Sequence, residues 1–586
     1  MRTMIPPRLE WLLPDSVPEP PTLAGFGAPV ATLLARRGFT SDEALTRFLE
    51  AGAGALHDIS RMADAEVALA RIGRAADGGE RIAIWGDYDA DGMSAVVVWV
   101  TALRRLGVEP VRYVPSRLEE GYGLSALGLR RLRDQGVALV ITCDCGVTNV
   151  AEARVARELG LDLVITDHHL PPVPLPEAVA VVDPHRPDCE YPDPDLTGAG
   201  VAYKLAAALL DRRGITTDGL ASIAAIGTVA DLAPMTGESR AIVRLGLAEL
   251  GADPPAGLRA LLARAADDPM RPTARDLAFG LVPRINAAGR IADVELAMRL
   301  LLETDPDRAD ALAEELEAVH LRRREMTATA VERARELAAA IGGDGPVVLR
   351  EDAWAPGIVG LVAGRLLDLL ARPAVVATLV GDEVRGSIRA PTDFHVVRAL
   401  DACAMHLTKR GGHAAAGGFS LRPETWAAFA EAFGTMTRPY PALLDRPVER
   451  PGRVVIDLVL PSRYVDWSLS DQLTRLEPFG PGHVEPVLAI TGMQLVEARR
   501  VGAKEQHLAF RLRRGIEAFD AVAFNVEPDR AVPEAGSWID LVGTLERDDF
   551  GGFPRLRLRV VDFADADSSP LVARRALARP TLARAG

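Results

Sequence analysis

The stretch RIAIWGDYDADGMSAV, residues 81–96, decides the fold of the chain. A short apolar run is followed at once by three alternating acids, Asp87, Asp89 and Asp91, and then by an apolar helical pattern from Ser94. Carboxylates this close repel one another unless cations hold them. An EF-hand calcium loop is excluded because no glutamate stands at the twelfth loop position. A solvated acidic turn is the alternative, and the position between a strand and a helix argues against it.

Short apolar runs alternate with helical patterns on the C-terminal side of this stretch. The runs VRYVPS, ALVITCD, DLVITD and AVAVVDP are typical of strands, and LGLRRLRDQG and VAEARVARELG are typical of helices. Alternation of this kind predicts a parallel, doubly wound α/β sheet. Open sheets of this class bind ligands at the carboxyl ends of their strands. We therefore expect the active site at that edge.

Two further predicted strand ends carry side chains of the types that can bind metals. Asp144 follows one apolar run, and Asp167, His168 and His169 follow the next. Adjacent histidines point in different directions, so one could bind a metal while the other faces the substrate or an acid. Asp231, which follows an apolar helical pattern in AIGTVADLAP, is a further candidate, with an ordinary helix-end carboxylate as the alternative.

The donor types indicate the metal and the reaction. Carboxylates with one or two imidazoles and no thiolate suit Mn²⁺ or Mg²⁺ better than a structural zinc ion. Two such ions would stabilise the attacking and leaving oxygens of a phosphoryl displacement. The sequence therefore predicts metal-dependent hydrolysis of phosphoesters.

Composition sets outer limits on the function. The chain has 586 residues and four cysteines, too few for a disulfide framework, and no cysteine spacing typical of zinc sites. It contains no run of roughly 20 apolar residues and no signal-peptide core at the N-terminus, so we expect a cytoplasmic protein that does not associate with membranes. The net charge of −14 argues at first against a polyanionic partner, but residues 451–586 hold 18 Lys and Arg against 19 Asp and Glu. Net charge therefore does not exclude DNA.

In their order along the chain, these motifs resemble those of the DHH phosphoesterases. The matching strings are GDYDADG, the central acid of TCDCG, TDHH, VVDPHRPDC and VADLAP, and GGHAAAGG resembles the glycine-rich motif of the DHHA1 domain. SRLEEGYGL, PRINAAGR, WAPGIVGLVAGRL and LEPFGPGHVEP are similar to the RecJ family in particular, except that His483 and Val484 replace the usual Asn-Pro.

The resemblance implies an α/β protein in which a parallel-sheet DHH domain and a smaller α/β DHHA1 domain are joined by a long helix, with a C-terminal OB-like β-barrel. The expected parts are an N-terminal helical entry segment (1–75), the DHH catalytic domain (76–305), the connecting helix (306–344), the DHHA1 domain (345–440), the OB-like nucleic-acid-binding domain (450–565) and a tail (566–586).

Site residues follow from the same resemblance. It implies that His169 is the active-site histidine, that Asp167 orients the histidines, and that the metal ligands are Asp87, Asp89, Asp91, Asp144, His168 and Asp231. It also implies a pocket for the 5′ phosphate built from Arg117, Arg290, Ser387 and Arg389. His413, from the second lobe, and Asn286 are further candidates for substrate binding. For each arginine a surface ion pair is the alternative, and Asn286 could instead shape a turn. Basic residues of the barrel that could contact DNA are Arg499, Arg500, Lys504, Arg511, Arg513 and Arg514.

The function implied is a 5′–3′ exonuclease specific for single-stranded DNA, which releases 5′-mononucleotides in DNA repair and recombination. The expected partners are single-stranded DNA with a 5′ phosphate and a single-strand-binding protein or a helicase, and the expected state is a monomer. One alternative is a DHH phosphatase or oligoribonuclease for small substrates, against which the extra barrel argues. The other is a Cdc45-like DNA-binding scaffold without catalysis, against which the complete set of acids argues.

Overall fold

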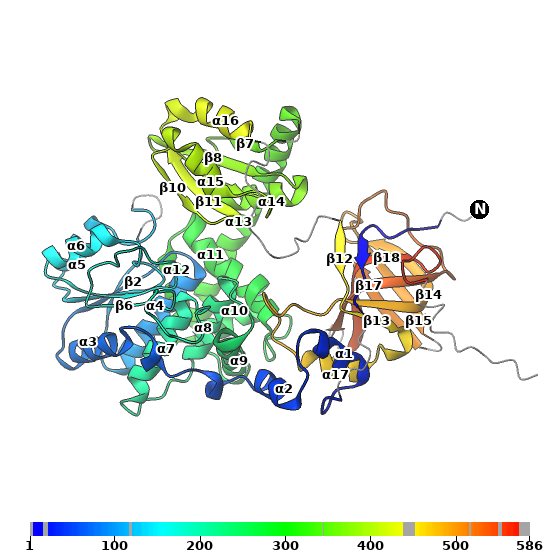
Figure 1. Cartoon of the computed structure of the whole chain (residues 1–586), viewed down its shortest axis with the longest axis horizontal. Coiled ribbons are helices and arrows are strands. Elements are labelled where there is room, and N and C mark those ends of the chain that lie inside the picture. The colour runs from blue at the N-terminus through cyan, green and yellow to red at the C-terminus, as the bar shows by residue number, and fades with distance from the viewer. Residues whose placement is uncertain are drawn as a thin grey trace, which may run out of the picture. The chain divides into compact units, whose positions relative to one another are not determined.

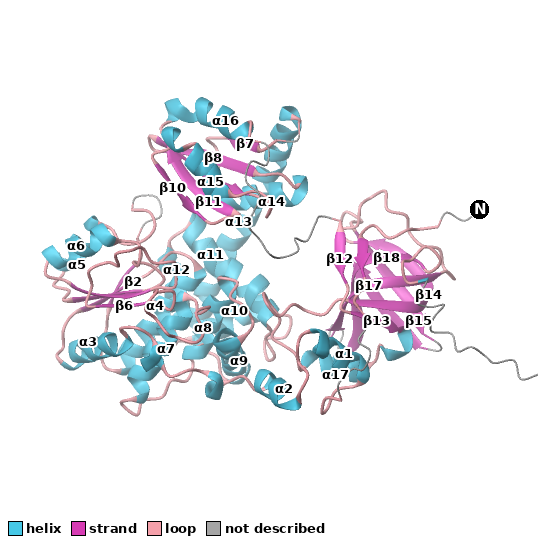
Figure 2. Ribbon diagram, viewed as in Figure 1, coloured by secondary structure: helices cyan, strands magenta, loops and turns pink. Residues whose placement is uncertain are grey.

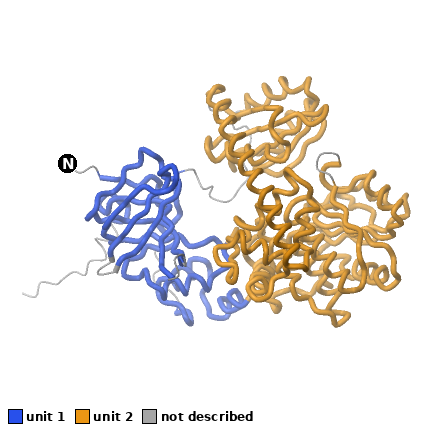
Figure 3. The backbone as a smooth tube through the Cα atoms, turned by 180° about the vertical axis from the view of Figure 1, so that it is seen from behind, with its two compact units in different colours: residues 1–50, 448–479, 483–586 blue, residues 51–447, 480–482 orange. Residues whose placement is uncertain are grey.

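The computed structural model describes residues 4–15, 22–115, 120–343, 345–436, 452–514, 517–548 and 554–572, without the side chains of 514 and 517. The chain forms two compact units (Figure 3). The first contains residues 1–50, 448–479 and 483–586, and the second contains residues 51–447 with 480–482. In the part of the chain that is described, no helix has the length and apolar character to cross a membrane.

A five-stranded sheet forms the base of the second unit (Figure 1). Its strands lie in the order β3 (Val111–Tyr113), β2 (Ile82–Trp85), β4 (Leu139–Thr142), β5 (Asp162–Thr166) and β6 (Ala180–Val182). All neighbours are parallel, which confirms the predicted sheet. The central strands are apolar throughout because both faces of a parallel sheet are covered by helices.

Alternate residues of β2 show the two covered faces. Ile82 and Ile84 belong to a core with helices α3 (Ala65–Asp77), α4 (Ala90–Arg105), α7 (Gly198–Asp211) and α8 (Leu220–Ala230). Ala83 and Trp85 belong to a separate core with α5 (Ala126–Asp134) and α6 (Val150–Glu158). The carboxyl ends of the strands between these layers carry the predicted site residues.

Further helices lead from the sheet to the long connecting helix. They are α9 (Gly237–Ala252), α10 (Ala256–Ala265), a π-helical stretch (Asp276–Leu281), α11 (Val282–Ile291) and α12 (Val294–Leu301). Helix α13 (Pro306–Ile341) is 36 residues long. Its first half packs in the core of the parallel sheet through Leu312 and Leu316, and its second half packs in the next core through Ala330 and Ala334. The predicted long connecting helix is therefore confirmed.

The smaller α/β lobe is built on a mixed sheet. Its order is β10 (Lys409–Gly412), β11 (Ala416–Leu421), β9 (Glu383–Arg389), β8 (Ala374–Val380) and β7 (Val347–Arg350). Only β7 and β8 are parallel. Its helices are α14 (Val359–Leu370), α15 (Val396–Ala402) and α16 (Trp426–Gly434).

The first unit contains a closed five-stranded barrel, whose strands are magenta in Figure 2. The order is β14 (Leu488–Val501), β15 (His507–Arg514), β16 (Glu517–Ala523), β18 (Arg555–Asp565) and β17 (Trp538–Asp548), and β17 pairs back to β14. Within the barrel only β16 and β18 are parallel. This Greek-key closure is that of an OB-fold, and the prediction of an OB-like barrel is confirmed.

The start of the chain belongs to this barrel unit. Strand β1 (Glu10–Leu12) pairs with β12 (Arg453–Val455), and β13 (Leu458–Pro461) extends the barrel beside β14. Helix α1 (Ala28–Arg36) packs on α17 (Trp467–Thr474), and α2 (Asp42–Leu49) follows α1. The buried carboxylate of Asp562 accepts hydrogen bonds from Leu9 N (2.8 Å) and from the Trp11 indole (2.9 Å). The N-terminal segment thus completes the barrel's core.

Candidate active site

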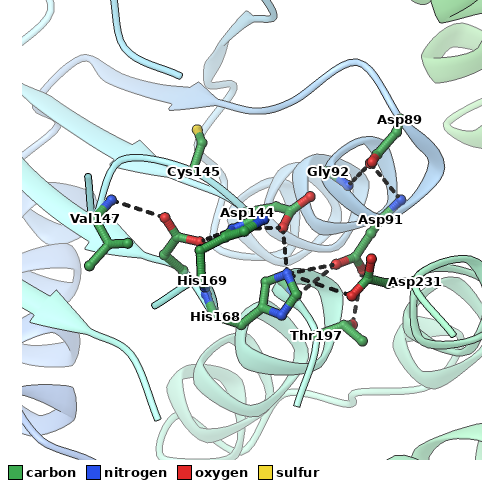
Figure 4. Close-up of polar contacts among 12 residues, drawn as sticks. Asp89, Asp91, Gly92, Asp144, Cys145, Val147, His168, His169, Thr197 and Asp231 are labelled. Carbon is green, nitrogen blue, oxygen red and sulfur yellow. Dashed lines mark hydrogen bonds and ion pairs between the residues drawn. The ribbon is translucent and has the colours of Figure 1, made fainter. Parts of the chain in front are cut away.

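The acidic turn between β2 and α4 is shaped by its own side chains and by a glycine. Asp89 Oδ1 caps α4 by accepting hydrogen bonds from Asp91 N (3.1 Å) and Gly92 N (3.0 Å), as Figure 4 shows. A Cβ atom on Gly92 would lie 2.7 Å from the Asp87 Cβ, so only glycine permits this approach. Asn286 Oδ1 accepts the Ala90 N–H at 2.9 Å and ties α11 to the turn.

Asp91 is anchored by the N-terminus of α7. The Thr197 hydroxyl donates to its Oδ1 (2.9 Å), Gly198 N donates to its Oδ2 (2.8 Å), and Ala199 N donates to its Oδ1 (3.0 Å). A helix N-terminus favours negative charge because its first N–H groups have no partner within the helix. Asp91 is 2% exposed, so these contacts fix a buried carboxylate in the site.

Asp144 lies just after β4 in a left-handed conformation, with φ of 61°. It is 3% exposed, and a Cβ on Gly198 would lie 2.4 Å from the Asp144 Cβ. Asp144 Oδ1 lies 3.0 Å from His168 Nε2 and accepts no hydrogen bond from the residues described. A carboxylate oxygen and an imidazole nitrogen therefore converge without a hydrogen bond between them.

His168 lies at the centre of three acids, as the close-up in Figure 4 shows. Besides Asp144, its Nε2 lies 3.9 Å from Asp91 Oδ2 and 3.8 Å from Asp231 Oδ2. Asp231 is the C-cap of α8. Sets of donor atoms that lie within 4.8 Å of one another are Asp144–His168–His169, Asp91–His168–Asp231 and Asp87–Asp89–Asp144. All six predicted metal ligands are thus brought together.

His169 is held on its Nδ1 side by an acid and a phenol. Asp167 Oδ1 lies 2.8 Å from His169 Nδ1, while Asp167 Oδ2 accepts the Val147 N–H at 2.9 Å. The Tyr122 hydroxyl donates to the Asp144 carbonyl (3.0 Å) and lies 3.2 Å from the same His169 nitrogen. Tyr122 was not among the predicted site residues. The signal available was its place in EGYGL, between Gly121 and Gly123, whose φ angles are 86° and 84°.

Burial and neighbouring negative charges raise the pKa values of three carboxyl groups in the site. Burial, with the charges of Asp231 and Asp89, raises the pKa of Asp91 to about 8, and burial with Asp89 raises the pKa of Asp231 to about 6. Burial and neighbouring acids also hold the pKa of Asp144 well above its usual range. Such shifts are those of carboxylates packed too closely to ionise together.

The two histidines shift in opposite directions. Burial and the charge of His169 lower the pKa of His168 to about 4. Burial also opposes the charged form of His169, but the hydrogen bond and charge of Asp167 outweigh it and raise its pKa to about 9. Near neutral pH, the His168 ring is therefore neutral and the His169 ring is positively charged.

This donor set fits divalent cations. The Asp144 oxygen without a hydrogen bond faces a neutral imidazole, and the surrounding carboxylates repel one another until positive charge enters. Oxygen donors with imidazole and no thiolate within the clusters suit Mn²⁺ or Mg²⁺.

Comparisons with known proteins identify the family of the chain. Family models match the chain as DHH family, N-terminal domain (residues 81–228), DHHA1 domain (343–436) and RecJ OB domain (456–562). The single-stranded-DNA-specific exonuclease RecJ of Bacillus subtilis is 34% identical over 539 residues, which cover 91% of this chain and 68% of that protein. The chain belongs to the RecJ family. RecJ of Escherichia coli is 31% identical, and the match covers 90% of this chain and 94% of that protein.

A solved RecJ structure shares the fold. The crystal structure of Thermus thermophilus RecJ in complex with Mn²⁺ matches with a TM-score of 0.79 and 30% identity, over 95% of this chain and 79% of that one. The structure of the same protein with Mg²⁺ matches with a TM-score of 0.73 and 28% identity, over 95% of this chain and 79% of that one.

The residues predicted for the RecJ-type phosphate pocket are in part brought together. Ser387 and Arg389 lie on β9, where Arg389 Nη1 donates to the Ser387 hydroxyl at 2.9 Å. Arg290 donates to the Gly357 carbonyl at 3.3 Å, across to the smaller lobe. His413 lies close enough for its charge to lower the pKa of His168. Arg117 falls outside the described residues.

The six basic residues predicted to contact DNA from the barrel differ in their surroundings. Those that are exposed are Arg499, Lys504, Arg511 and Arg513. Arg500 instead donates to the carbonyls of Glu505, Glu527, Pro528 and Arg530, which gives it a structural role between two loops. The side chain of Arg514 lies outside the described residues.

Proposed function

We propose that this chain is a metal-dependent exonuclease that degrades single-stranded DNA with Mn²⁺ or Mg²⁺. One observation carries the proposal: three donor groups at the carboxyl edge of the parallel sheet are linked by His168, which belongs to two of them, and by Asp144, which also belongs to two. The proteins that the chain resembles over most of their length are exonucleases specific for single-stranded DNA, and two related crystal structures hold Mn²⁺ or Mg²⁺.

The metal ligands of the proposed site are the three acids of the turn, Asp144, His168 and Asp231. When bound, two divalent ions supply positive charge to the attacking and leaving oxygens of the scissile phosphodiester. Asp144 and Asp91 are held rigidly by β4 and by the N-terminus of α7, so the donors need little reorganisation.

His169 and Asp167 perform the second part of the chemistry. Asp167 accepts a hydrogen bond from His169 Nδ1–H and fixes the ring, which leaves Nε2 to face the phosphate. Because the pKa of His169 is about 9, the ring carries a second proton on Nε2 at neutral pH. That N–H donates a charged hydrogen bond to a phosphate oxygen, which stabilises the charge that develops there.

Direction and products complete the proposal. Arg290, Ser387 and Arg389, with Arg117 and His413, hold a terminal 5′ phosphate, because guanidinium groups bind phosphate oxygens in a forked geometry. A strand held by its 5′ end would lose 5′-mononucleotides in the 5′–3′ direction. The same proposal places the enzyme in DNA repair and recombination in the cytoplasm, as a monomer with a single-strand-binding protein or a helicase as partner.

The test compares labelled strands. We expect 5′-labelled single-stranded DNA to lose its label as mononucleotides with Mn²⁺ or Mg²⁺, before 3′-labelled DNA does, while duplex DNA stays intact. Asp89→Asn keeps the cap of α4 but removes a charge from the site, and it should lower the rate at least about 100-fold. Asp293→Asn is the matched control, because Asp293 caps α12 in the same way outside the site. Simultaneous loss of both labels from internal cuts, or hydrolysis of pyrophosphate with DNA untouched, would contradict the proposal.

A further inference from the structure

Leu232, which follows the predicted ligand Asp231, lies in a conformation that leucine rarely adopts. Its φ is 58°, in the left-handed region that favours glycine or asparagine. Helix α8 ends here, with Leu232 N donating to Val229 O and Ala233 N donating to Thr228 O, both at 3.3 Å. Glycine would satisfy this helix end without steric cost. The backbone alone therefore gives no reason for leucine.

Burial does not explain the leucine at position 232 either. The Leu232 side chain is 68% exposed, although leucine gains stability from leaving water. A residue distant in the sequence holds the loop that follows, because Met235 N donates to Pro481 O at 2.6 Å. A bulky apolar side chain is thus kept in an unfavourable conformation and in solvent. Residues held in sparsely populated backbone conformations cluster at functional sites.

A second exposed leucine follows the proposed active-site histidine. Leu170 follows His169 and is 75% exposed. Each leucine directly follows a residue of the metal and histidine cluster, Asp231 for Leu232 and His169 for Leu170. The Cα atoms of such neighbours lie about 3.8 Å apart. Because Asp231 Oδ2 lies 3.8 Å from His168 Nε2, the backbone of both leucines lies next to the proposed site of the scissile phosphodiester.

We propose that Leu232 and Leu170 hold the nucleobase of the nucleotide that is being removed. This inference rests on the proposed function, because it assigns the substrate's base to that same site. A phosphodiester bound to the metals carries a sugar and a base within a few ångströms, and the base offers the apolar faces that two exposed leucines can cover. Contact with a flat face tolerates any base sequence, as an exonuclease requires.

The experiment compares a normal 5′-phosphorylated strand with one whose first nucleotides lack bases. With the normal strand, Leu232→Asn, which tolerates the left-handed backbone, should raise KM about tenfold, and Leu232→Met should restore it. With the abasic strand, the wild-type protein and Leu232→Asn should have the same KM. An equal effect of Leu232→Asn on both strands would overturn the inference.

Three controls separate this result from other causes. Leu232→Gly relieves the backbone, so its melting temperature should not fall while KM for the normal strand rises. Ala371→Gly removes another left-handed residue, the exposed C-cap of α14, and should leave KM unchanged. Mn²⁺ affinity, measured by electron paramagnetic resonance, should match wild type in every variant. Loss of Mn²⁺ binding in Leu232→Asn would overturn the inference, whereas failure of wild type to degrade the normal strand would refute the proposed function instead.

Discussion

At the scale of single residues, His169 depends on contacts from Asp167 and Tyr122 at the same ring nitrogen. Tyr122→Phe removes the hydroxyl that bonds the Asp144 carbonyl and faces His169. A lost hydrogen bond of about 0.5–1.5 kcal/mol corresponds to a kcat lowered roughly two- to thirteenfold, with KM unchanged because the ring remains. Steady-state kinetics on single-stranded DNA measure both values. A raised KM at constant kcat would show that Tyr122 binds substrate rather than positions His169.

Asp91 and His169 make the metal-free protein less stable as the pH rises. Burial and nearby acids raise the pKa of Asp91 from 3.8 to about 8; burial opposes the shift at His169, yet Asp167 raises that pKa from 6.5 to about 9. Each group binds its proton more tightly in the folded chain than in the unfolded chain. The stabilisation of the folded state is therefore complete at pH values below the unfolded pKa and decreases as the pH rises to the folded pKa. In EDTA, the melting temperature should therefore fall between pH 6.5 and pH 9.

The melting temperature in saturating Mn²⁺ tests how the cation changes this pH dependence. A cation stabilises the ionised carboxylates and binds only the folded site, so its effect on stability grows as the acids deprotonate. We expect the increase in melting temperature on adding Mn²⁺ to be larger at pH 9 than at pH 6.5. An equal increase at both values would show that the acids are already ionised in the metal-free protein.

At the scale of elements, helices α7 and α8 approach the acids through glycines. A Cβ on Gly198 would lie 2.4 Å from the Asp144 Cβ, and one on Gly227 would lie 2.4 Å from Asp91 Oδ1. Gly198→Ala should therefore cost about 1–3 kcal/mol of unfolding free energy and weaken Mn²⁺ binding. Urea denaturation and titration calorimetry measure the two effects.

The matched control for that substitution is Gly364→Ala in α14. An added Cβ there meets nothing within 4 Å, so the better helix propensity of alanine should raise stability by about 0.8–1 kcal/mol. If both alanine variants changed stability in the same direction, close approach at Gly198 would not be the cause.

Elements with local signals could be predicted from the sequence. The parallel sheet follows from alternating strand and helix patterns, and the acids at its edge follow from their place at strand ends, as with Asp144. Tyr122 could not be assigned this way, because its contact with His169 joins positions 47 residues apart. The strained backbone of Leu232 carries no signal either, because sequence patterns describe preferred conformations and leucine does not prefer this one.

At the scale of the whole molecule, the first residues of the chain stabilise a barrel formed by the last. Removing residues 1–15 deletes the N–H donors that reach Asp562 and Asp565 and leaves these buried carboxylates without those partners. The loss should cost at least about 2 kcal/mol. Hydrogen exchange should show faster opening in residues 488–565.

The catalytic unit serves as the internal control for this truncation. Its strands β2, β4 and β5 belong to the other compact unit, so their exchange and their Mn²⁺-dependent protection should stay unchanged. Equal acceleration in both units would show that the chain unfolds as one cooperative body.

The discontinuous barrel unit also fixes an order of events during synthesis. Its first fifty residues leave the ribosome before the whole catalytic unit, and their partners start only at residue 448. At about 5–20 residues per second, this segment waits roughly 20–80 s for β12 and the barrel strands. The metal-binding unit can therefore finish folding while the barrel is still unmade. A nascent chain stalled before residue 448 would already contain all six proposed metal ligands and would lack the OB-fold barrel.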